Sequence, residues 1–160
     1  MPLSIFYHPD FLNHDTGSGH PEHPGRLEAC IEALINCDFA KQFKWKSPRS
    51  ATQEELSWVH TAQHIEHIKE VCYSGGGYLD ADTPVCEKSF AIALKSAGAW
   101  MDGVDEVMNK NSAFILSRPP GHHAEKNRGM GFCLFSNAAL AAYTALKLNG
   151  INKICIFDWD

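Results

Sequence analysis

The sequence lacks the features that mark exported, membrane-spanning and nucleic-acid-binding chains. Its six cysteines form no Cys-x-x-Cys pair, and its first residues contain no basic segment followed by a long apolar stretch. No apolar run approaches the roughly 18 residues that span a membrane. Basic residues form no cluster, and the net charge is −5 with neutral histidines. We therefore expect a cytoplasmic protein with reduced thiols that binds neither nucleic acid nor a membrane.

What the sequence contains is sufficient for one folded domain. Its 160 residues, of which 44% are apolar, supply the material for a sizeable core. No repeat, low-complexity tract or long linker divides the chain. We therefore expect residues 1–160 to belong to a single domain.

Several segments show the spacing of an amphipathic helix or begin with a residue that commonly caps one. The expected helices cover residues 26–36, two short stretches within 53–71, roughly 90–109, and 137 to about 148. Their expected N-cap residues are Thr52, Thr61, Ser89 and Asn137.

Three short apolar runs, at residues 2–8, 113–116 and 153–157, predict strands. The C-terminal third therefore follows the order strand, loop, helix, strand, which is typical of a βαβ unit in a parallel sheet. The expected fold class is α/β, with a parallel sheet flanked by helices. Ligands of such sheets bind beyond the carboxyl ends of the strands, so the polar residues that follow the last two strands should meet at one edge.

The first of these polar groups is a pair of adjacent histidines in the motif R-P-P-G-H-H-A, residues 118–124. Neighbouring side chains on an irregular loop point in different directions, so His122 and His123 can play different parts. Histidine suits proton transfer because its pKa lies near neutrality. Taken locally, the sequence favours the alternative of two solvent-exposed loop histidines.

The second polar group is the D-W-D motif at the end of the last apolar run. Alternate residues of a strand share a face, which would direct Asp158 and Asp160 to one place. Two carboxylates there repel each other, and a bound cation would offset that repulsion. Two solvated acids are the alternative interpretation.

Two further segments stand out by composition. G-F-C at residues 131–133 precedes a predicted helix, where Phe132 can wall a narrow apolar pocket or join the core. Residues 14–26 are dense in polar, proline and glycine residues and predict a stiff loop.

Three histidines have the spacing of a helical metal site. His60, His64 and His67 share one face of a predicted helix, and such spacing can bind zinc. However, residue 61 is threonine, so the H-E-x-x-H motif is absent. We expect these side chains to pack in the core or to face solvent.

In combination these motifs resemble those of the histone deacetylase and acetylpolyamine amidohydrolase superfamily. The order is H-x-T-G-x-G-H-P-E-x-P-x-R, G-G-Y-L-D-A-D-T, R-P-P-G-H-H-A, G-F-C-x-F-x-N and D-W-D, from about His14 to Asp160. The pattern is most similar to the bacterial deacetylase-like amidohydrolases and the second class of metazoan enzymes. The resemblance implies an arginase-deacetylase fold and hydrolysis of an acetylated amine at zinc.

The resemblance also implies roles for individual residues. His122 and His123 correspond to the family's tandem catalytic histidines, of which one acts as general base and both guide proton transfer to the leaving amine. Asp160 corresponds to a zinc ligand, and Asp158 corresponds to a ligand of a structural monovalent cation, usually potassium. The other implied positions are Gly131 and Phe132 in the acetyl-lysine tunnel, Arg26 and Cys133 at the acetate-release channel, and Asp80 or Asp82 at the substrate backbone.

The sequence also departs from the family pattern. In the family, D-W-D continues as V-H-H-G-N-G, whose histidine is the second zinc ligand, and a later aspartate and tyrosine complete the site. None of these follows Asp160 in this sequence. We therefore expect the N-terminal part of a longer deacetylase domain, truncated after D-W-D, with an incomplete sheet and no activity of its own.

Two other functions remain open. One is a catalytically incomplete, deacetylase-like binding module that needs a partner chain. The other is an arginase-like metallohydrolase, although tandem histidines suit a single zinc better than a two-metal cluster. A deacetylase substrate could be acetyl-lysine in a protein or an acetylpolyamine, and the negative net charge favours the cationic polyamine only weakly. The sequence does not indicate an oligomeric state.

Overall fold

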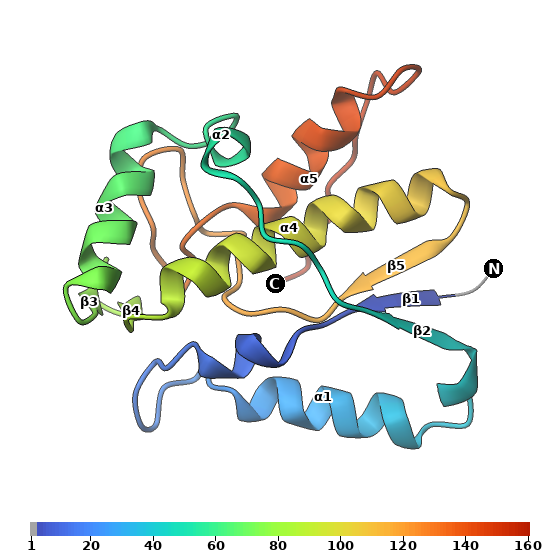
Figure 1. Ribbon diagram of the computed structural model, residues 1–160, viewed down its shortest axis with the longest axis horizontal. Coiled ribbons are helices and arrows are strands. Elements are labelled where there is room, and N and C mark those ends of the chain that lie inside the picture. The colour runs from blue at the N-terminus through green and yellow to red at the C-terminus, as the bar shows by residue number, and fades with distance from the viewer. Residues whose placement is uncertain (1–2) are drawn as a thin grey trace.

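The sheet of this protein consists of three short parallel strands between helices (Figure 1). The computed structural model describes residues 3–160. Strand β1 (Leu3–Phe6) lies in the centre, with β2 (Phe43–Lys46) on one side and β5 (Ser112–Ile115) on the other. Ile5 of β1 pairs with Trp45 and with Phe114. All three carboxyl ends therefore point to the same edge, where a ligand site is expected in such a sheet.

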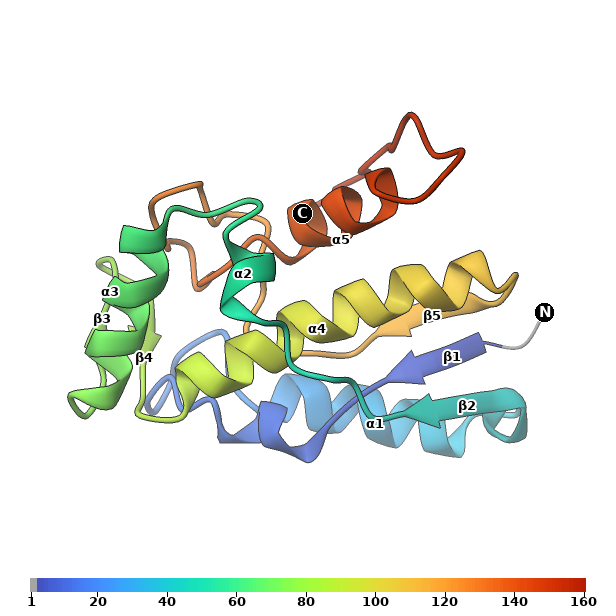
Figure 2. The ribbon, with the colours of Figure 1, turned by 45° about the horizontal axis from the view of Figure 1, so that its top comes forward.

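Helices cover both faces of this sheet, as the two ribbon views show (Figures 1 and 2). Helix α1 (Gly25–Asn36) lies against one face, and the long helix α4 (Ser89–Met108) lies against the other. The remaining helices are α2 (Gln53–Leu56), α3 (Ala62–Tyr73), α5 (Asn137–Leu146) and the 3-10 helices Pro9–Asn13 and Ala40–Gln42. A small antiparallel pair, β3 (Gly77–Tyr78) with β4 (Pro84–Val85), precedes α4.

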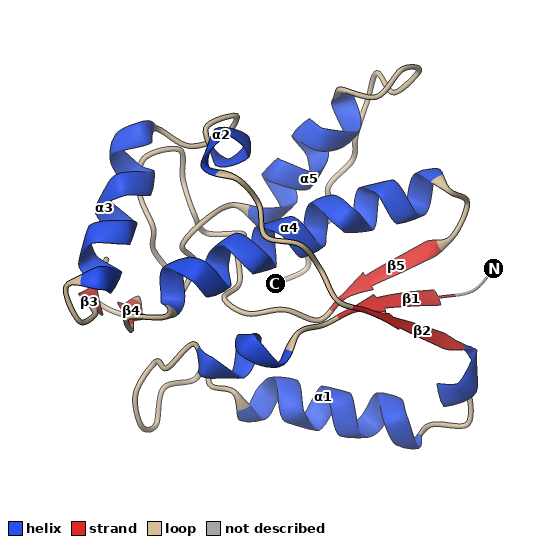
Figure 3. Cartoon of the chain, viewed as in Figure 1, coloured by secondary structure: helices blue, strands red, loops and turns tan. Residues whose placement is uncertain are grey.

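Two clusters of buried apolar side chains lie on either side of α4. One lies between α1, β1 and α4 and includes Ile5, Leu27 and Ile92. The other lies between α3, α4 and the segment that leads into α5, and it includes Leu134 and Leu140. Each fully buried side chain of this size contributes about 1.5–3 kcal/mol through removal from water. The second cluster therefore anchors the long loop between β5 and α5, which Figure 3 shows as irregular backbone.

The expected helices all form, and two of the four expected caps are confirmed. The Thr52 side chain accepts a hydrogen bond from the Glu55 backbone, and the Glu55 carboxylate accepts one from Thr52 N–H, which is a complete capping box. Thr61 accepts from the backbone N–H of His64.

The other two expected caps are wrong, because the side chains are used elsewhere. Helices α4 and α5 begin at Ser89 and Asn137, and neither residue before them caps its helix with a side chain. The buried Ser89 Oγ accepts from Cys86 N–H and lies 2.7 Å from His14 Nδ1. The buried Asn137 amide donates to Ser96 Oγ. Contacts between distant segments therefore took precedence over local capping.

The strand predictions were right at β1 and β5 and wrong elsewhere. Strand β2 was missed because its sequence, F-K-W-K, is short and half charged. The expected strand at 153–157 does not form, and residues 151–160, called the tail below, have no regular structure. Phe157 and Trp159 are 80% and 89% exposed. An apolar run becomes a strand only where another strand pairs with it. The βαβ unit predicted for the C-terminal third is therefore not completed within residues 3–160. None of the helices in this range is long and apolar enough to cross a bilayer.

Candidate active site

The tandem histidines stand on the histidine loop, residues 117–124, which leaves the carboxyl end of β5. A fully buried guanidinium, that of Arg118, anchors its first part. Gly121 packs directly against the start of α5. A Cβ atom there would lie 2.6 Å from Asn137 N and 2.8 Å from Phe135 O. Only glycine permits this approach, which places the two histidines beside the amino end of α5.

His122 and His123 lie side by side but have different neighbours. Their ring centroids are 4.1 Å apart, with planes inclined at 56°. His122 Nδ1 lies 2.9 Å from Asp158 Oδ2, and His122 Nε2 lies 3.3 Å from Asp160 Oδ2. His123 lies instead against Gly131, where an added Cβ would come within 2.6 Å of its Cδ2. The structure thus brings the paired histidines and both acids of D-W-D together, at the edge predicted from the sequence.

The two acids reach this place on the exposed tail. Asp158 and Asp160 have side chains that are 50% and 78% exposed. The pKa of Asp158 is lowered, first by the hydrogen bond that Asp160 N–H donates to its carboxylate and then by His122. Carboxylate oxygens are suitable ligands for zinc and for harder cations. Among residues 3–160, however, no three His, Cys, Asp or Glu side chains are arranged to hold a metal ion, so these acids form at most part of a metal site.

A groove of about 770 Å³ runs from these groups along α4, α5, β5 and the tail. Its walls are mainly apolar, with Trp100, Val104 and Ala141 on the two helices and Ile154 on the tail. His122, Asp158 and Asp160 lie at one end. The polar groups of the site therefore border a large apolar depression.

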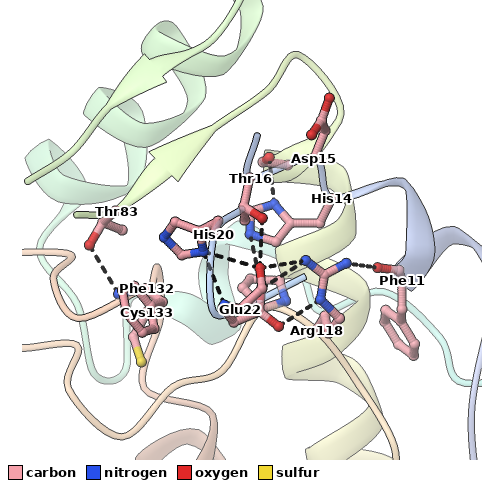
Figure 4. A network of polar contacts seen from close by, with 12 residues as sticks. Phe11, His14, Asp15, Thr16, His20, Glu22, Thr83, Arg118, Phe132 and Cys133 are labelled. Carbon is pink, nitrogen blue, oxygen red and sulfur yellow. Dashed lines mark hydrogen bonds and ion pairs between the residues drawn. The ribbon is translucent and has the colours of Figure 1, made fainter. Parts of the chain in front are cut away.

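Phe132 stands in a tight reversal, the aromatic turn, residues 130–133. Met130 and Cys133 exchange two backbone hydrogen bonds of 3.0 Å, and Gly131 and Phe132 have φ values of +56° and +69°. Two successive positive φ values define a type I′ turn. The ring of His20 stands edge-on to Phe132, with 4.7 Å between centroids, and Phe132 N–H donates to Thr83 Oγ1 at 3.0 Å (Figure 4).

The two candidate acids of the acid loop, residues 79–83, differ in their surroundings. The Asp80 carboxylate accepts a hydrogen bond from Arg128 Nη2 at 3.0 Å. Asp82 is exposed, its carboxylate accepts from the Thr83 hydroxyl at 3.3 Å, and its backbone carbonyl lies 3.2 Å from His20 Nε2. Asp80 is thus engaged by a cation, whereas Asp82 lies next to the aromatic turn and keeps its carboxylate accessible.

Arg26 and Cys133, the residues expected at an acetate channel, have contrasting environments. The Arg26 side chain is 60% exposed, and its Nη1 lies 3.6 Å from Glu22 Oε1. Cys133 is fully buried, and burial raises the pKa of its thiol to about 11. Cys133 is therefore a neutral thiol in the interior, while Arg26 lies largely in solvent.

Sequence reasoning missed the most buried polar contact of this region, the pair Arg118–Glu22. Arg118 Nε and Nη2 donate to the two Glu22 carboxylate oxygens at 2.6 and 2.8 Å, and Nη1 donates to Phe11 O at 3.0 Å (Figure 4). Both residues are 1% exposed. His14 lies beside them, and its burial lowers its pKa to about 4. The available signal was that both residues lie inside the two most distinctive motifs.

The three histidines with helical spacing have different surroundings. His60 and His64 are buried, with ring centroids 5.1 Å apart, and His67 is exposed. His60 Nε2 accepts from Ser136 N–H at 2.9 Å, and His64 Nε2 lies 3.0 Å from Leu134 O. Burial lowers the pKa of His60 to about 4. These side chains pack in the core or face solvent, as predicted.

The chain is similar to known proteins in sequence and in structure. The family description "Histone deacetylase domain" matches residues 20–160. An uncharacterised protein of Synechocystis sp. is 43% identical over 99% of this chain and 53% of its own length, and a protein of Methanothermobacter thermautotrophicus named "Probable deacetylase" is 36% identical over 94% and 44%. The HD domain of HDA15 superposes with a TM-score of 0.83 and 32% identity, over 90% of this chain and 43% of that structure.

The chain therefore spans about half the length of the relatives that it matches. The superposition and the parallel sheet flanked by helices agree with an arginase-deacetylase fold, which confirms the expected fold class. Because the matched family description covers most of the sequence, the chain belongs to the histone deacetylase and amidohydrolase superfamily.

Proposed function

We propose that this chain forms part of a zinc-dependent deacetylase, which hydrolyses acyl groups from amines such as acetyl-lysine or acetylpolyamines. Membership of the deacetylase superfamily supports a hydrolase of this type. The observation that carries the proposal is the meeting of His122 and His123 with Asp158 and Asp160 beyond the carboxyl end of β5. A proton-transfer pair next to cation-binding carboxylates is the arrangement that metal-assisted amide hydrolysis requires.

In this proposal Asp160 is a zinc ligand and Asp158 a ligand of a structural potassium ion. When bound, zinc supplies a Lewis acid that polarises the amide carbonyl and promotes ionisation of water. In this proposal the other zinc ligands come from outside residues 3–160, among which no three candidate ligands lie together. The 160-residue chain by itself is expected to be inactive.

The tandem histidines move the protons. One of them takes a proton from the attacking water, and the pair delivers a proton to the nitrogen of the leaving amine. The contact of His122 with both carboxylates fixes its ring, and the contact of His123 with Gly131 places it beside the aromatic turn. The two histidines thus connect the acids to the surface that would receive the acyl group.

Substrate selection is assigned to the loops around the histidines. Gly131 and Phe132 would wall the passage for the acylated side chain. Asp82 is the better candidate for holding the substrate backbone, because Arg128 already occupies the Asp80 carboxylate. Cys133, with Arg26 nearer the surface, remains our proposal for the route by which acetate leaves.

The decisive experiment is a deacetylation assay on the full-length protein, with an acetyl-lysine peptide and an acetylated polyamine as substrates. We expect acetate release that a zinc chelator abolishes. His122→Ala and His123→Ala should each lower kcat/KM by about 10²-fold or more, the usual contribution of a general acid–base group. His67→Ala removes an exposed histidine on α3 and is the matched control.

Two results would contradict the proposal. Turnover that survives both histidine substitutions would remove the pair from the reaction. Tight binding of the acetylated peptide without any turnover would favour the alternative of a deacetylase-like binding module.

A further inference from the structure

The backbone of Phe132 adopts a conformation that bulky residues rarely accept. Its φ of +69° lies in the left-handed region, where a side chain with a Cβ atom crowds the backbone. The second central position of a type I′ turn usually holds glycine or asparagine for this reason. Such a conformation persists only where the surrounding structure imposes it, and it is common at functional sites.

From outside the turn, the hydroxyl of Thr83 binds the backbone of Phe132. Thr83 is fully buried, and its Oγ1 accepts the Phe132 N–H at 3.0 Å. The same hydroxyl donates to Asp82 Oδ1 at 3.3 Å, and the Thr83 carbonyl accepts from Leu79 N–H at 3.0 Å. One side chain therefore joins the acid loop to the aromatic turn, as the left side of Figure 4 shows.

The far side of the aromatic turn rests on a catalytic candidate. Gly131 touches the ring of His123 so closely that a Cβ atom would overlap it. A shift of the turn away from Thr83 would therefore displace both the Phe132 ring and the surface against which His123 lies. His20, edge-on to Phe132, holds the ring but forms no bond to the turn backbone.

We propose that Thr83 is a positioning residue for substrate binding. Its hydroxyl fixes the left-handed conformation of Phe132 and orients the Asp82 carboxylate, so that the two groups face the same acylated substrate. The inference rests on the proposed deacetylase function, because Phe132 and Asp82 are assigned to substrate there. The inference adds that Thr83, a buried residue that is not one of the reacting groups, sets the alignment of Phe132 and Asp82.

The test removes the hydroxyl while preserving the shape of the side chain. In the full-length enzyme, Thr83→Val should raise KM for the acetyl-lysine peptide about tenfold, the effect of one lost hydrogen bond. The fall in kcat should be smaller, because the contacts of His122 with the two acids are untouched and only the surface that supports His123 is altered. Thr83→Ser, which keeps the hydroxyl, should restore KM. Thr144→Val, which removes a hydroxyl bonded only to Leu140 O within α5, is the matched control.

A second readout does not depend on activity. Amide hydrogen exchange at Phe132 should accelerate about tenfold or more in Thr83→Val and stay unchanged in Thr144→Val, since only the first substitution removes the acceptor. If the wild-type enzyme shows no turnover, the proposed function fails, and this exchange rate still decides whether Thr83 holds the turn. Unchanged exchange would overturn the inference, as would an unchanged KM in an active enzyme.

A third variant covers the case in which Thr83→Val folds but is strongly destabilised. Glycine adopts a positive φ without strain. In a Phe132→Gly background the Thr83 hydroxyl is therefore no longer needed to hold the left-handed conformation. We expect Thr83→Val to lower the unfolding midpoint in denaturant less in that background than in the wild-type protein. An equal loss in both backgrounds would show that Thr83 is an ordinary core residue and would overturn the inference.

Discussion

The histidine loop and the tail bring complementary groups to the same place but are held in opposite ways. The first part of the histidine loop is anchored by Arg118, which is 1% exposed and makes four hydrogen bonds to Phe11 and Glu22 in the first part of the chain. The tail has no regular structure, and its acids contact His122 from exposed positions. The loop that carries His122 and His123 is thus anchored in the interior through Arg118, although both histidines are exposed, whereas the tail rests on the surface.

This difference separates two physical regimes. In a buried, bidentate arginine–carboxylate pair, water cannot take the place of a lost partner. Removal of one partner therefore leaves a desolvated charge. An exposed imidazole–carboxylate contact competes with water and is screened by salt. The buried pair should therefore control stability, and the exposed contact should affect only the local arrangement of the site.

The largest effect should come from the buried pair. Arg118→Met should lower the free energy of unfolding by about 3–5 kcal/mol, because the Glu22 carboxylate loses its main partner in the interior. Arg26→Met removes the exposed arginine next to the same carboxylate and should cost at most about 0.5 kcal/mol. Urea denaturation of the two variants measures their losses in free energy of unfolding. Equal losses would show that burial does not determine how much each arginine beside Glu22 contributes to stability.

A fall in pH should also destabilise the protein, through its buried histidines. The pKa of His14 and of His60 is lowered to about 4 by burial. Above pH 6.5 both are neutral whether the chain is folded or unfolded, so they do not affect stability. Between about pH 6.5 and 4 only the unfolded chain binds these protons, and stability falls by up to about 1.4 kcal/mol per pH unit for each histidine.

Unfolding curves at pH 7 and pH 5 measure this effect. The free energy of unfolding should fall less between pH 7 and pH 5 in His60→Gln than in the wild-type protein, because one of the buried histidines with a lowered pKa has been removed. His67→Gln, which alters an exposed residue, should behave as the wild type. A free energy of unfolding that is the same at both pH values would contradict the assignment of neutral buried histidines.

The smallest effect should come from the tail. Asp158→Asn removes a charge from an exposed contact with His122, so we expect no measurable change in the unfolding midpoint. The His122 ring resonances should nevertheless shift in NMR spectra, because their neighbour has changed. A clear drop in stability would mean that the tail contributes to the core, and the contrast with Arg118 would fail.

Local patterns predicted the elements that depend on local interactions. The period of the apolar residues and the caps Thr52 and Thr61 identified helices whose first turns are stabilised by neighbours in sequence. The motifs also indicated that His122 would meet the D-W-D acids, and it does, although the acids reach it on an irregular tail and not on the strand from which the prediction was argued.

The failures all involve partners far away in sequence. Residues 153–157 are apolar enough for a strand, but a strand needs a neighbour to receive its backbone bonds. Arg118 looked like a loop residue because its partner, Glu22, lies 96 positions earlier. Ser89 was expected to cap a helix, yet its hydroxyl lies against His14, 75 positions away. The spacing of apolar residues along the sequence carries no information about pairs of residues that lie so far apart in it.

The position of α4 between the two hydrophobic clusters has a consequence for how the chain melts. Ile92 and Ala99 face the cluster with α1, whereas Ala93, Ala97 and Met101 face the cluster with α3. Because one helix supplies side chains to both, neither cluster can come apart while the other keeps its full contacts. The part of the molecule that carries the histidines and the part that carries the sheet therefore share a single cooperative transition.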